Sequence, residues 1–291
     1  MSRALRFSPI SILALASVTW TPLASAQEEL LEEVTVTGSR ASFSTAEDAP
    51  VPVSVLTNEM LTNTGATELG RAIQAAAPSF NFSSSSISDG TDALRPATLR
   101  GLGPDQTLVL INGKRRHTSA LVHVNTSVGR GTAGTDMNAI PISAVKRVEV
   151  LRDGAAAQYG SDAIAGVINI ILKDSASDGI ATLEYGETFE GDGETWVANV
   201  NSGFALGSEG FVNVTYQYRD RGATNRAGLD GTRQYPCTDG TTIDFGCSTI
   251  TTLDPREATF DRNSFRIGDA DNEQHALTAN AALTMGMGEL Y

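Results

Sequence analysis

Long apolar segments are scarce in this sequence. Outside the extreme N-terminus no run of about 18 apolar residues occurs, so no helix is expected to span a membrane. Basic residues are also scarce, with 21 Lys and Arg against 34 Asp and Glu, and a surface of that sign repels nucleic acid. Charged and hydrophobic residues make up 19% and 41% of the chain, which excludes a mainly disordered protein.

The N-terminus has the three-part pattern of a secretory signal. Arg3 and Arg6 precede an apolar core, residues 10–18, that is too short to span a bilayer. A small-x-small motif ends at Ala26, which predicts that residues 1–26 are a signal peptide cleaved after that residue. Removing two of the 21 basic residues leaves 19 against 34 acidic ones, so the expected mature chain has a formal charge of −15.

Cysteine and histidine are rare as well. Cys237 and Cys247 lie in a Gly/Asp/Thr-rich stretch with no histidine close in sequence, which disfavours a metal site. Because an exported protein meets an oxidising compartment, the leading prediction is a disulfide between these two cysteines. His117 and His123 accompany a glycine-rich loop without a matching ligand pattern, so solvated side chains are favoured over a metal site.

Catalytic and cofactor motifs are missing too. The string Gly129-x-Gly131-x-x-Gly134 follows no apolar strand, and Pro141 leaves no room for a helix after it, so a dinucleotide site is not expected. No G-x-S-x-G elbow and no pair of carboxylates at a catalytic spacing is found. The sequence therefore predicts no cofactor and no enzymatic activity.

Residues 27–40 contain a short run of strong strand formers without a hairpin partner. An isolated extended segment of this kind is suited to adding onto the sheet edge of another protein. The residues at the centre of this segment are Glu33, Val34, Thr35, Val36 and Thr37.

Residues 41–174 predict a compact unit of mixed strands and short helices. Leu69, Ile73 and Ala76 follow helical spacing, and Pro78 ends that helix. Asn112-Gly113 is a tight-turn signal directly after an apolar strand. The expected strands lie near 51–55 and at 107–111, 144–151 and 166–172, with helical turns at 155–159 and loops at 83–92 and 117–136.

Residues 175–291 show a strict alternation of apolar and polar residues. Four strands are predicted, and a loop of roughly fifty residues separates the last two. Short turns alternating with a long loop, and apolar faces alternating with polar ones, are typical of transmembrane β-barrels. The alternative is a soluble β-sandwich. The predicted strands cover residues 181–185, 196–204, 212–218 and 277–283.

Several segments resemble the family of TonB-dependent outer-membrane receptors. The sequence from Glu32 to Gly38, EEVTVTG, is similar to a TonB box, and Thr98 to Gly103 and Thr107 to Gly113 continue the resemblance. The most specific stretch runs from Val145 to Lys173, VKRVEVLRDGAAAQYGSDAIAGVINIILK. The resemblance is close over residues 32–174. After residue 174 it rests only on the alternation of apolar and polar residues.

The resemblance implies an α+β plug domain, with a small mixed sheet and short helices, followed by antiparallel transmembrane barrel strands. It implies energy-coupled uptake of a scarce large solute, with a ferric siderophore or similar iron complex as the commonest case. TonB is the implied partner of residues 33–37, and outer-membrane lipid surrounds the strands. Outward plug loops are implied to contact the solute, which points to Asp89, Asp92, His117, His123 and Arg130.

Two alternatives accompany this interpretation. The first is a non-transporting receptor or adhesin of the outer membrane that keeps the plug as a scaffold. The second is an inactive, truncated receptor, because four strands leave open edges that lipid does not tolerate and a new strand begins near Glu289. A TonB box favours transport, since passive binding needs no energy coupling.

Overall fold

The computed structural model describes residues 52–85, 90–124, 128–208, 210–229, 231, 233–238, 253–261, 266–285 and 288–290. All of them belong to one compact unit, residues 33–291. The predicted signal peptide and the predicted TonB box lie outside the described residues. No helix within these ranges is long and apolar enough to cross a membrane.

Short elements make up the first part of the described chain, residues 52–174, here named the globular part. Its elements are β1 (Val53–Thr57), α1 (Asn58–Thr62), α2 (Leu69–Ala76), β2 (Phe80–Phe82), β3 (Ala97–Leu99), η2 (Pro104–Gln106), β4 (Thr107–Ile111), β5 (Lys114–Arg115), η3 (Ile142–Ala144), β6 (Val145–Leu151), α3 (Ala156–Tyr159), η4 (Ser161–Ala163) and β7 (Gly166–Leu172).

A mixed sheet organises the globular part. Its strand order is β1-β6-β7-β4-β5, and only the β4–β7 pair is parallel. Strand β7 lies in the middle of the sheet, so its near-continuous apolar sequence is buried on both faces. On one face Ile168 and Ile170 pack with Leu61 and Ile73 of the helices, and on the other face Val167 belongs to a second, smaller cluster.

Local sequence signals account for the turns and helices. Thr57 caps α1, because its hydroxyl accepts a hydrogen bond from the Met60 amide at 3.2 Å. The turn between β4 and β5 needs two positive φ angles, and Asn112 (48°) and Gly113 (75°) supply them. The predicted turn, and the predicted strands and helix at these places, are confirmed.

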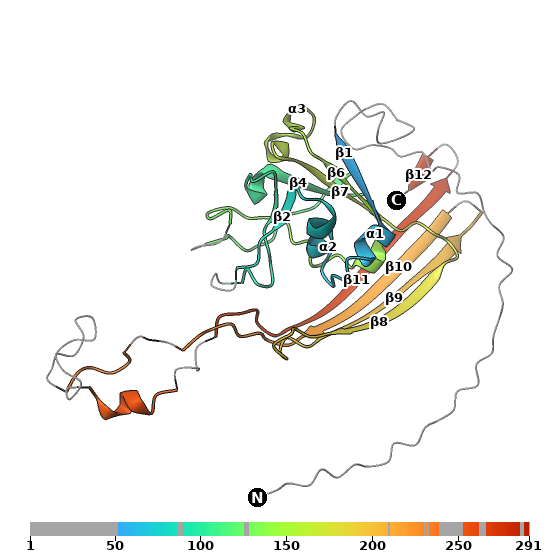
Figure 1. Cartoon of the computed structure of the whole chain (residues 1–291). Coiled ribbons are helices and arrows are strands. Elements are labelled where there is room, and N and C mark those ends of the chain that lie inside the picture. The colour runs from blue at the N-terminus through green and yellow to red at the C-terminus, as the bar shows by residue number, and fades with distance from the viewer. Residues whose placement is uncertain are drawn as a thin grey trace, which may run out of the picture. The chain divides into compact units, whose positions relative to one another are not determined.

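Long strands make up the second part. They are β8 (Gly179–Gly186), β9 (Thr195–Leu206), β10 (Gly210–Arg221), β11 (Asn272–Met285) and β12 (Gly288–Leu290), with η7 (Pro255–Ala258) between β10 and β11. All neighbouring pairs are antiparallel. Figure 1 shows β8, β9, β10 and β11 side by side in one curved sheet, named here the long-strand sheet.

The long-strand sheet buries its polar face and exposes its apolar face. Asn199, Asn201 and Gln217 are buried, whereas Leu183 and Leu277, on the opposite face, are 71% and 75% exposed. The buried amides bond one another; for example, Gln217 Nε2 donates to Asn199 Oδ1 at 2.8 Å. Water disfavours an exposed apolar face of this extent, whereas hydrocarbon matches it. The prediction of lipid-facing strands is therefore favoured over the soluble sandwich.

The structure adds details to the predicted strands. The four predicted strands correspond to β8, β9, β10 and β11, and the short β12 is the additional strand expected to begin near Glu289. A short turn joins β9 to β10, whereas residues 222–271 separate β10 from β11. The sheet therefore has a short-turn end and a long-loop end.

Candidate functional site

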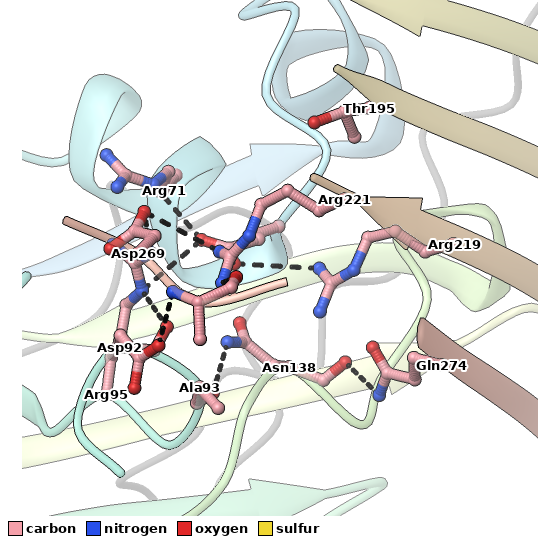
Figure 2. Close-up of polar contacts among 12 residues, drawn as sticks. Arg71, Asp92, Ala93, Arg95, Asn138, Thr195, Arg219, Arg221, Asp269 and Gln274 are labelled. Carbon is pink, nitrogen blue, oxygen red and sulfur yellow. Dashed lines mark hydrogen bonds and ion pairs between the residues drawn. The ribbon is translucent and has the colours of Figure 1, made fainter. Parts of the chain in front are cut away.

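The globular part contacts the long-strand sheet through a cluster of charged side chains. Glu68 and Arg71 come from the start of α2, and Arg95 comes from the segment before β3. Arg219 and Arg221 are among the last three residues of β10, and Asp269 precedes β11. These six residues are named the ion-pair cluster, and most of them are labelled in Figure 2.

Glu68 is the centre of the ion-pair cluster. It precedes the first residue of α2, which buries Leu69 and Ile73, and only 5% of Glu68 is exposed. Arg71, one turn further along, donates from Nε to Glu68 Oε2 at 3.0 Å. The two helix residues therefore present a carboxylate and a guanidinium together to the strand ends.

The arginines of β10 reach Glu68 because of strand alternation. Arg219 and Arg221 have the same parity as the buried residues Thr215 and Gln217, so they belong to the inward face. The distances from their Nη1 atoms to Glu68 Oε1 are 3.7 and 3.4 Å. The end of β10 is thus tied to the start of α2.

Arg95 completes the cluster from the globular part. Its side chain is fully buried, and its Nη2 donates to Asp269 Oδ2 at 3.0 Å while its Nε lies 3.6 Å from Glu68 Oε2. Burial lowers the pKa of the Arg95 guanidinium, although the carboxylate of Glu68 acts in the opposite direction. Arg95 therefore depends on its two carboxylates for compensation of its buried charge.

Positive charge is in excess in this cluster. Four guanidinium groups surround the carboxylates of Glu68 and Asp269. Within the described residues, Nη1 of Arg95 and Nε of Arg221 are buried without a hydrogen-bond partner. Loss of either carboxylate would leave a larger uncompensated charge, which is strongly destabilising when it is buried.

Hydrogen bonds also tie the globular part to the residues at the start of β11. Asp92 Oδ2 accepts from the Ala270 amide at 2.8 Å, and the carbonyl of Asp92 accepts from Arg95 Nε at 3.2 Å. Gln274 Nε2 donates to the carbonyl of Asn138 at 3.0 Å (Figure 2). Together with Arg219 and Arg221, which precede the long loop, these residues hold the globular part at the long-loop end.

Contacts nearer the short-turn end are neutral. Asn112 Nδ2 donates to Asn280 Oδ1 at 3.1 Å, and Asn280 Nδ2 donates to the carbonyl of Lys173 at 2.9 Å. Ser143 Oγ donates to Asn199 Oδ1 at 3.1 Å. The two parts are therefore joined by ion pairs at one end and by single hydrogen bonds elsewhere.

The structure separates the residues predicted to face the solute. Asp92 is half-buried against Ala270, His117 and Arg130 are exposed, and His123 is buried; Asp89 lies outside the described residues. Contact of His123 with a solute would require its loop to open. The role of these residues in solute binding stays a prediction.

The other predicted site residues are mostly outside the described ranges. Glu33 to Thr37, the predicted TonB-binding residues, are among them, as is Cys247. Cys237 is buried and disulfide-bonded, and its pairing with Cys247 stays a prediction. Among the residues that the structure describes, no three His, Cys, Asp or Glu side chains are grouped in a way that would hold a metal ion.

Sequence reasoning missed the ion-pair cluster. A usable signal was present in β10, where Arg219 and Arg221 fall on the face otherwise occupied by amides and hydroxyls. Charged residues on an inward strand face need partners from another element. Nothing in the local sequence pointed to Glu68 or Asp269 as those partners.

We predict that acidification loosens the loop around His123. Burial lowers the pKa of this imidazole below 6.5, so the folded loop binds a proton less readily than the unfolded chain does. The stability contributed by the neutral ring is complete above pH 6.5 and is lost as the pH falls below it. Below about pH 6.5, the protection factors of the amides at 128–136, which are corrected for the pH dependence of intrinsic exchange, should fall by up to about tenfold per pH unit.

Two histidine variants check this pH dependence. This loss of protection should disappear in His123→Gln, which cannot be protonated, and should persist in His117→Gln, whose parent side chain is exposed. The same loss of protection in His123→Gln would show that another group is responsible.

Most of the globular part matches the model of a known protein family. Residues 45–167 match the family model described as TonB-dependent Receptor Plug Domain. The match begins and ends inside the predicted plug, residues 41–174, and it ends within β7. The division into residues 1–26, 27–40, 41–174 and 175–291 stays a prediction.

The chain is also similar in sequence to two bacterial receptors. It is 31% identical over 194 residues to the "Probable TonB-dependent siderophore receptor PirA" of Acinetobacter baumannii, covering 64% of this chain and 26% of that protein. It is 32% identical over 212 residues to the "Ferric enterobactin receptor PirA" of Pseudomonas aeruginosa, covering 70% of this chain and 28% of that protein.

A solved structure agrees with these sequence matches. The ferric enterobactin receptor PfeA of Pseudomonas aeruginosa, in complex with BCV-L6, superposes with a TM-score of 0.52 at 27% identity, covering 65% of this chain and 28% of that chain. This chain thus spans less than a third of the length of each of these three proteins.

Proposed function

Because the chain belongs to the family of TonB-dependent receptors, we propose that it forms the N-terminal part of a transporter that imports a large solute across the bacterial outer membrane. The observation that carries this proposal is the plug-domain match over residues 45–167. The long-strand sheet that follows, with its apolar face exposed, supports it. In this proposal the long-loop end faces outward and the short-turn end faces the periplasm.

The proposed solute is a metal chelate, with a ferric siderophore as the leading candidate. Two relatives are named as ferric enterobactin or siderophore receptors, and others are named as vitamin B12 transporters. All of these names describe receptors or transporters, which supports a transport role over an enzymatic one. Residues 1–26 would direct export and be removed after Ala26.

The proposed energy source is TonB, acting on residues 33–37. An extended Val-Thr-Val segment can pair with a sheet edge of a partner, and main-chain hydrogen bonds then provide the affinity. A pull on this segment would act on the plug through β1, the first described strand. No nucleotide site in this chain is required, because the inner-membrane proton gradient would supply the energy.

The ion-pair cluster gives the plug an attachment that resists this pull. Glu68 and Arg95 belong to the plug, whereas Arg219, Arg221 and Asp269 belong to the strands and their loop. Their contacts lie at the long-loop end, so a solute bound among the outer loops would act next to them. We expect transport to require that these ion pairs separate or exchange partners.

The test is uptake of ferric enterobactin by cells that produce the full-length protein. Uptake should stop when the proton gradient is collapsed with an uncoupler. A peptide spanning Glu32 to Gly38 should capture the periplasmic domain of TonB, and Val36→Pro should weaken this capture. Proline removes a ladder hydrogen bond, and a loss of about 1.4 kcal/mol already corresponds to tenfold weaker binding.

The control for the box is Ala41→Pro, which lies just beyond residues 27–40. Uptake should be unchanged in this variant, and a peptide extended to position 41 should capture TonB equally well with alanine or proline there. If surface binding of ferric enterobactin is retained but no uncoupler-sensitive uptake occurs, the non-transporting receptor is favoured instead. If Val36→Pro captures TonB as well as the wild-type peptide does, the box assignment is wrong.

A further inference from the structure

The two ends of the long loop, residues 222–226 and 267–270, are bonded to each other and are named here the loop base. The Thr224 amide donates to the carbonyl of Asp269 at 2.9 Å, and the Asp269 amide donates back to Thr224 Oγ1 at 2.9 Å. A Cβ atom on Gly268 would lie 2.1 Å from the carbonyl oxygen of Thr224, so the two segments are in direct contact. The long loop therefore starts from two paired segments rather than from two separate ones.

The loop between β8 and β9, residues 187–194, is fastened to the loop base by one carboxylate. Asp192 accepts from both Nη atoms of Arg226, at 2.6 and 2.8 Å, and from the Asn225 amide at 3.0 Å. Within its own loop it also accepts from the Thr188 hydroxyl. The Arg226 guanidinium, above all, holds the pKa of the Asp192 carboxyl well below its usual range, so the pair stays charged at neutral pH. Because the pair is bidentate, it fixes orientation as well as distance.

Close backbone packing adds to this attachment. The Gly222 amide donates to the carbonyl of Glu194 at 2.7 Å. A Cβ atom on Gly193 would lie 2.6 Å from Thr224 Cγ2, and the φ of Gly193 is 67°, so glycine is what allows the approach. The β8–β9 loop and the loop base are thus joined by side chains and backbone alike. Together they are named the outer-loop unit.

Asp269 joins the outer-loop unit to the plug. Its backbone pairs with Thr224, whereas its carboxylate accepts from Nη2 of the fully buried Arg95 at 3.0 Å (Figure 2). A shift of the loop base would therefore move a carboxylate that compensates Arg95. Arg95 would keep Glu68, 3.6 Å away, but it shares that carboxylate with three further arginines.

We propose that the outer-loop unit couples the position of the outer loops to the attachment of the plug, with Asp269 as the connecting residue. When the unit shifts, Asp269 withdraws from Arg95, and the less compensated buried charge loosens the segment before β3. Asp192 and Arg226 are positioning residues, because they act on the plug through the loop base. This inference rests on the proposed transport function, in which a solute bound among the outer loops supplies the shift. The coupling itself needs no solute.

The test is hydrogen exchange of the purified full-length protein in detergent, followed by mass spectrometry on residues 90–99. The amides of Ala93 and Leu94 in this segment donate to the carbonyl of Gly90. In Arg226→Met, which removes the ion pair, their protection factors should fall about threefold, since an exposed pair can transmit no more than its own modest energy. Arg226→Lys, which keeps the charge, should recover most of the protection.

Arg256→Met is the matched control, because it removes another exposed Arg–Asp pair from the same long loop. Arg256 donates to Asp254 at 2.8 and 3.0 Å, and neither residue belongs to the loop base. Protection at residues 90–99 should be unchanged in this variant. The route is checked with Asp269→Asn, which should lower the protection by itself. Adding Arg226→Met to that variant should cause no further loss.

Each other outcome overturns the proposal. Unchanged protection in Arg226→Met, no recovery in Arg226→Lys, an equal loss in Arg256→Met, a loss of the same size throughout β6, or additive losses in the double variant would each do so. The exchange measurement needs neither solute, TonB nor energised cells. Failed uptake with the coupling intact therefore counts against the transport function alone, whereas active uptake without the coupling counts against this inference alone.

Discussion

Glu68→Gln is expected to loosen the attachment of the plug more than any other single charge removal. The change keeps the shape of the side chain but leaves Arg95 and Arg221 with Asp269 as their remaining carboxylate in the cluster, and it removes the ion pair of Arg219 with Glu68. Breaking a buried ion pair by removing one partner costs about 3–5 kcal/mol. The free energy of unfolding, measured by chemical denaturation of the full-length protein in detergent, should fall by that amount.

Glu59→Gln is the matched control for this prediction. Glu59 lies on the exposed side of α1, so its loss should cost less than about 0.5 kcal/mol. A double-mutant cycle with Arg95→Met should give a coupling energy of about 1 kcal/mol or more, since the two residues share one network. Equal stability of the two glutamine variants would show that the cluster does not hold the plug.

Gly166→Ala is expected to prevent normal folding of the plug. Gly166 opens β7 with a φ of 137°, a conformation that side chains rarely adopt. An added Cβ would lie 2.2 Å from the carbonyl oxygen of Leu151 and 2.6 Å from Leu99 Cδ2. Strain and overpacking each cost about 1–3 kcal/mol, so the combined loss is about 3 kcal/mol or more.

Gly186→Ala controls for a glycine-to-alanine change in a strand. Nothing lies within 4 Å of the position that its Cβ would occupy. Thermal unfolding followed by circular dichroism should show a melting temperature close to that of the wild type for Gly186→Ala and a strongly lowered one for Gly166→Ala. Similar melting temperatures would mean that the β6–β7 pair shifts to accept the methyl group.

The elements that could be predicted carry their signal within a few residues. The apolar run of β7, the helical spacing of Leu69 and Ile73, and the turn residues Asn112 and Gly113 all act locally. The long strands were predictable because alternation extends over many residues. By contrast, α1, β2 and β3 have at most five residues each, too few for a periodic pattern to show.

The parts that could not be predicted depend on contacts between distant segments. Strands β4 and β7 pair in parallel, and nothing in the sequence of either strand identifies the other as its partner. Arg221 and Glu68 are 153 residues apart, and Arg95 and Asp269 are 174 residues apart. The family resemblance indicated which fold to expect, but only the three-dimensional structure shows which charges of this chain form ion pairs.

Because the long strands bury their polar side chains and expose their apolar ones, substitutions should be tolerated at different positions than in most proteins. In most proteins, leucine and valine positions are sensitive and amide positions are permissive. Here Leu183, Val200 and Leu277 should accept any apolar residue that hydrocarbon accepts, because they touch few neighbours. Asn201 and Gln217 should tolerate little, because replacing either would leave a buried amide oxygen, that of Asn213 or Asn199, without this donor. A saturation library of β9 and β10 would therefore lose function mostly at its polar positions.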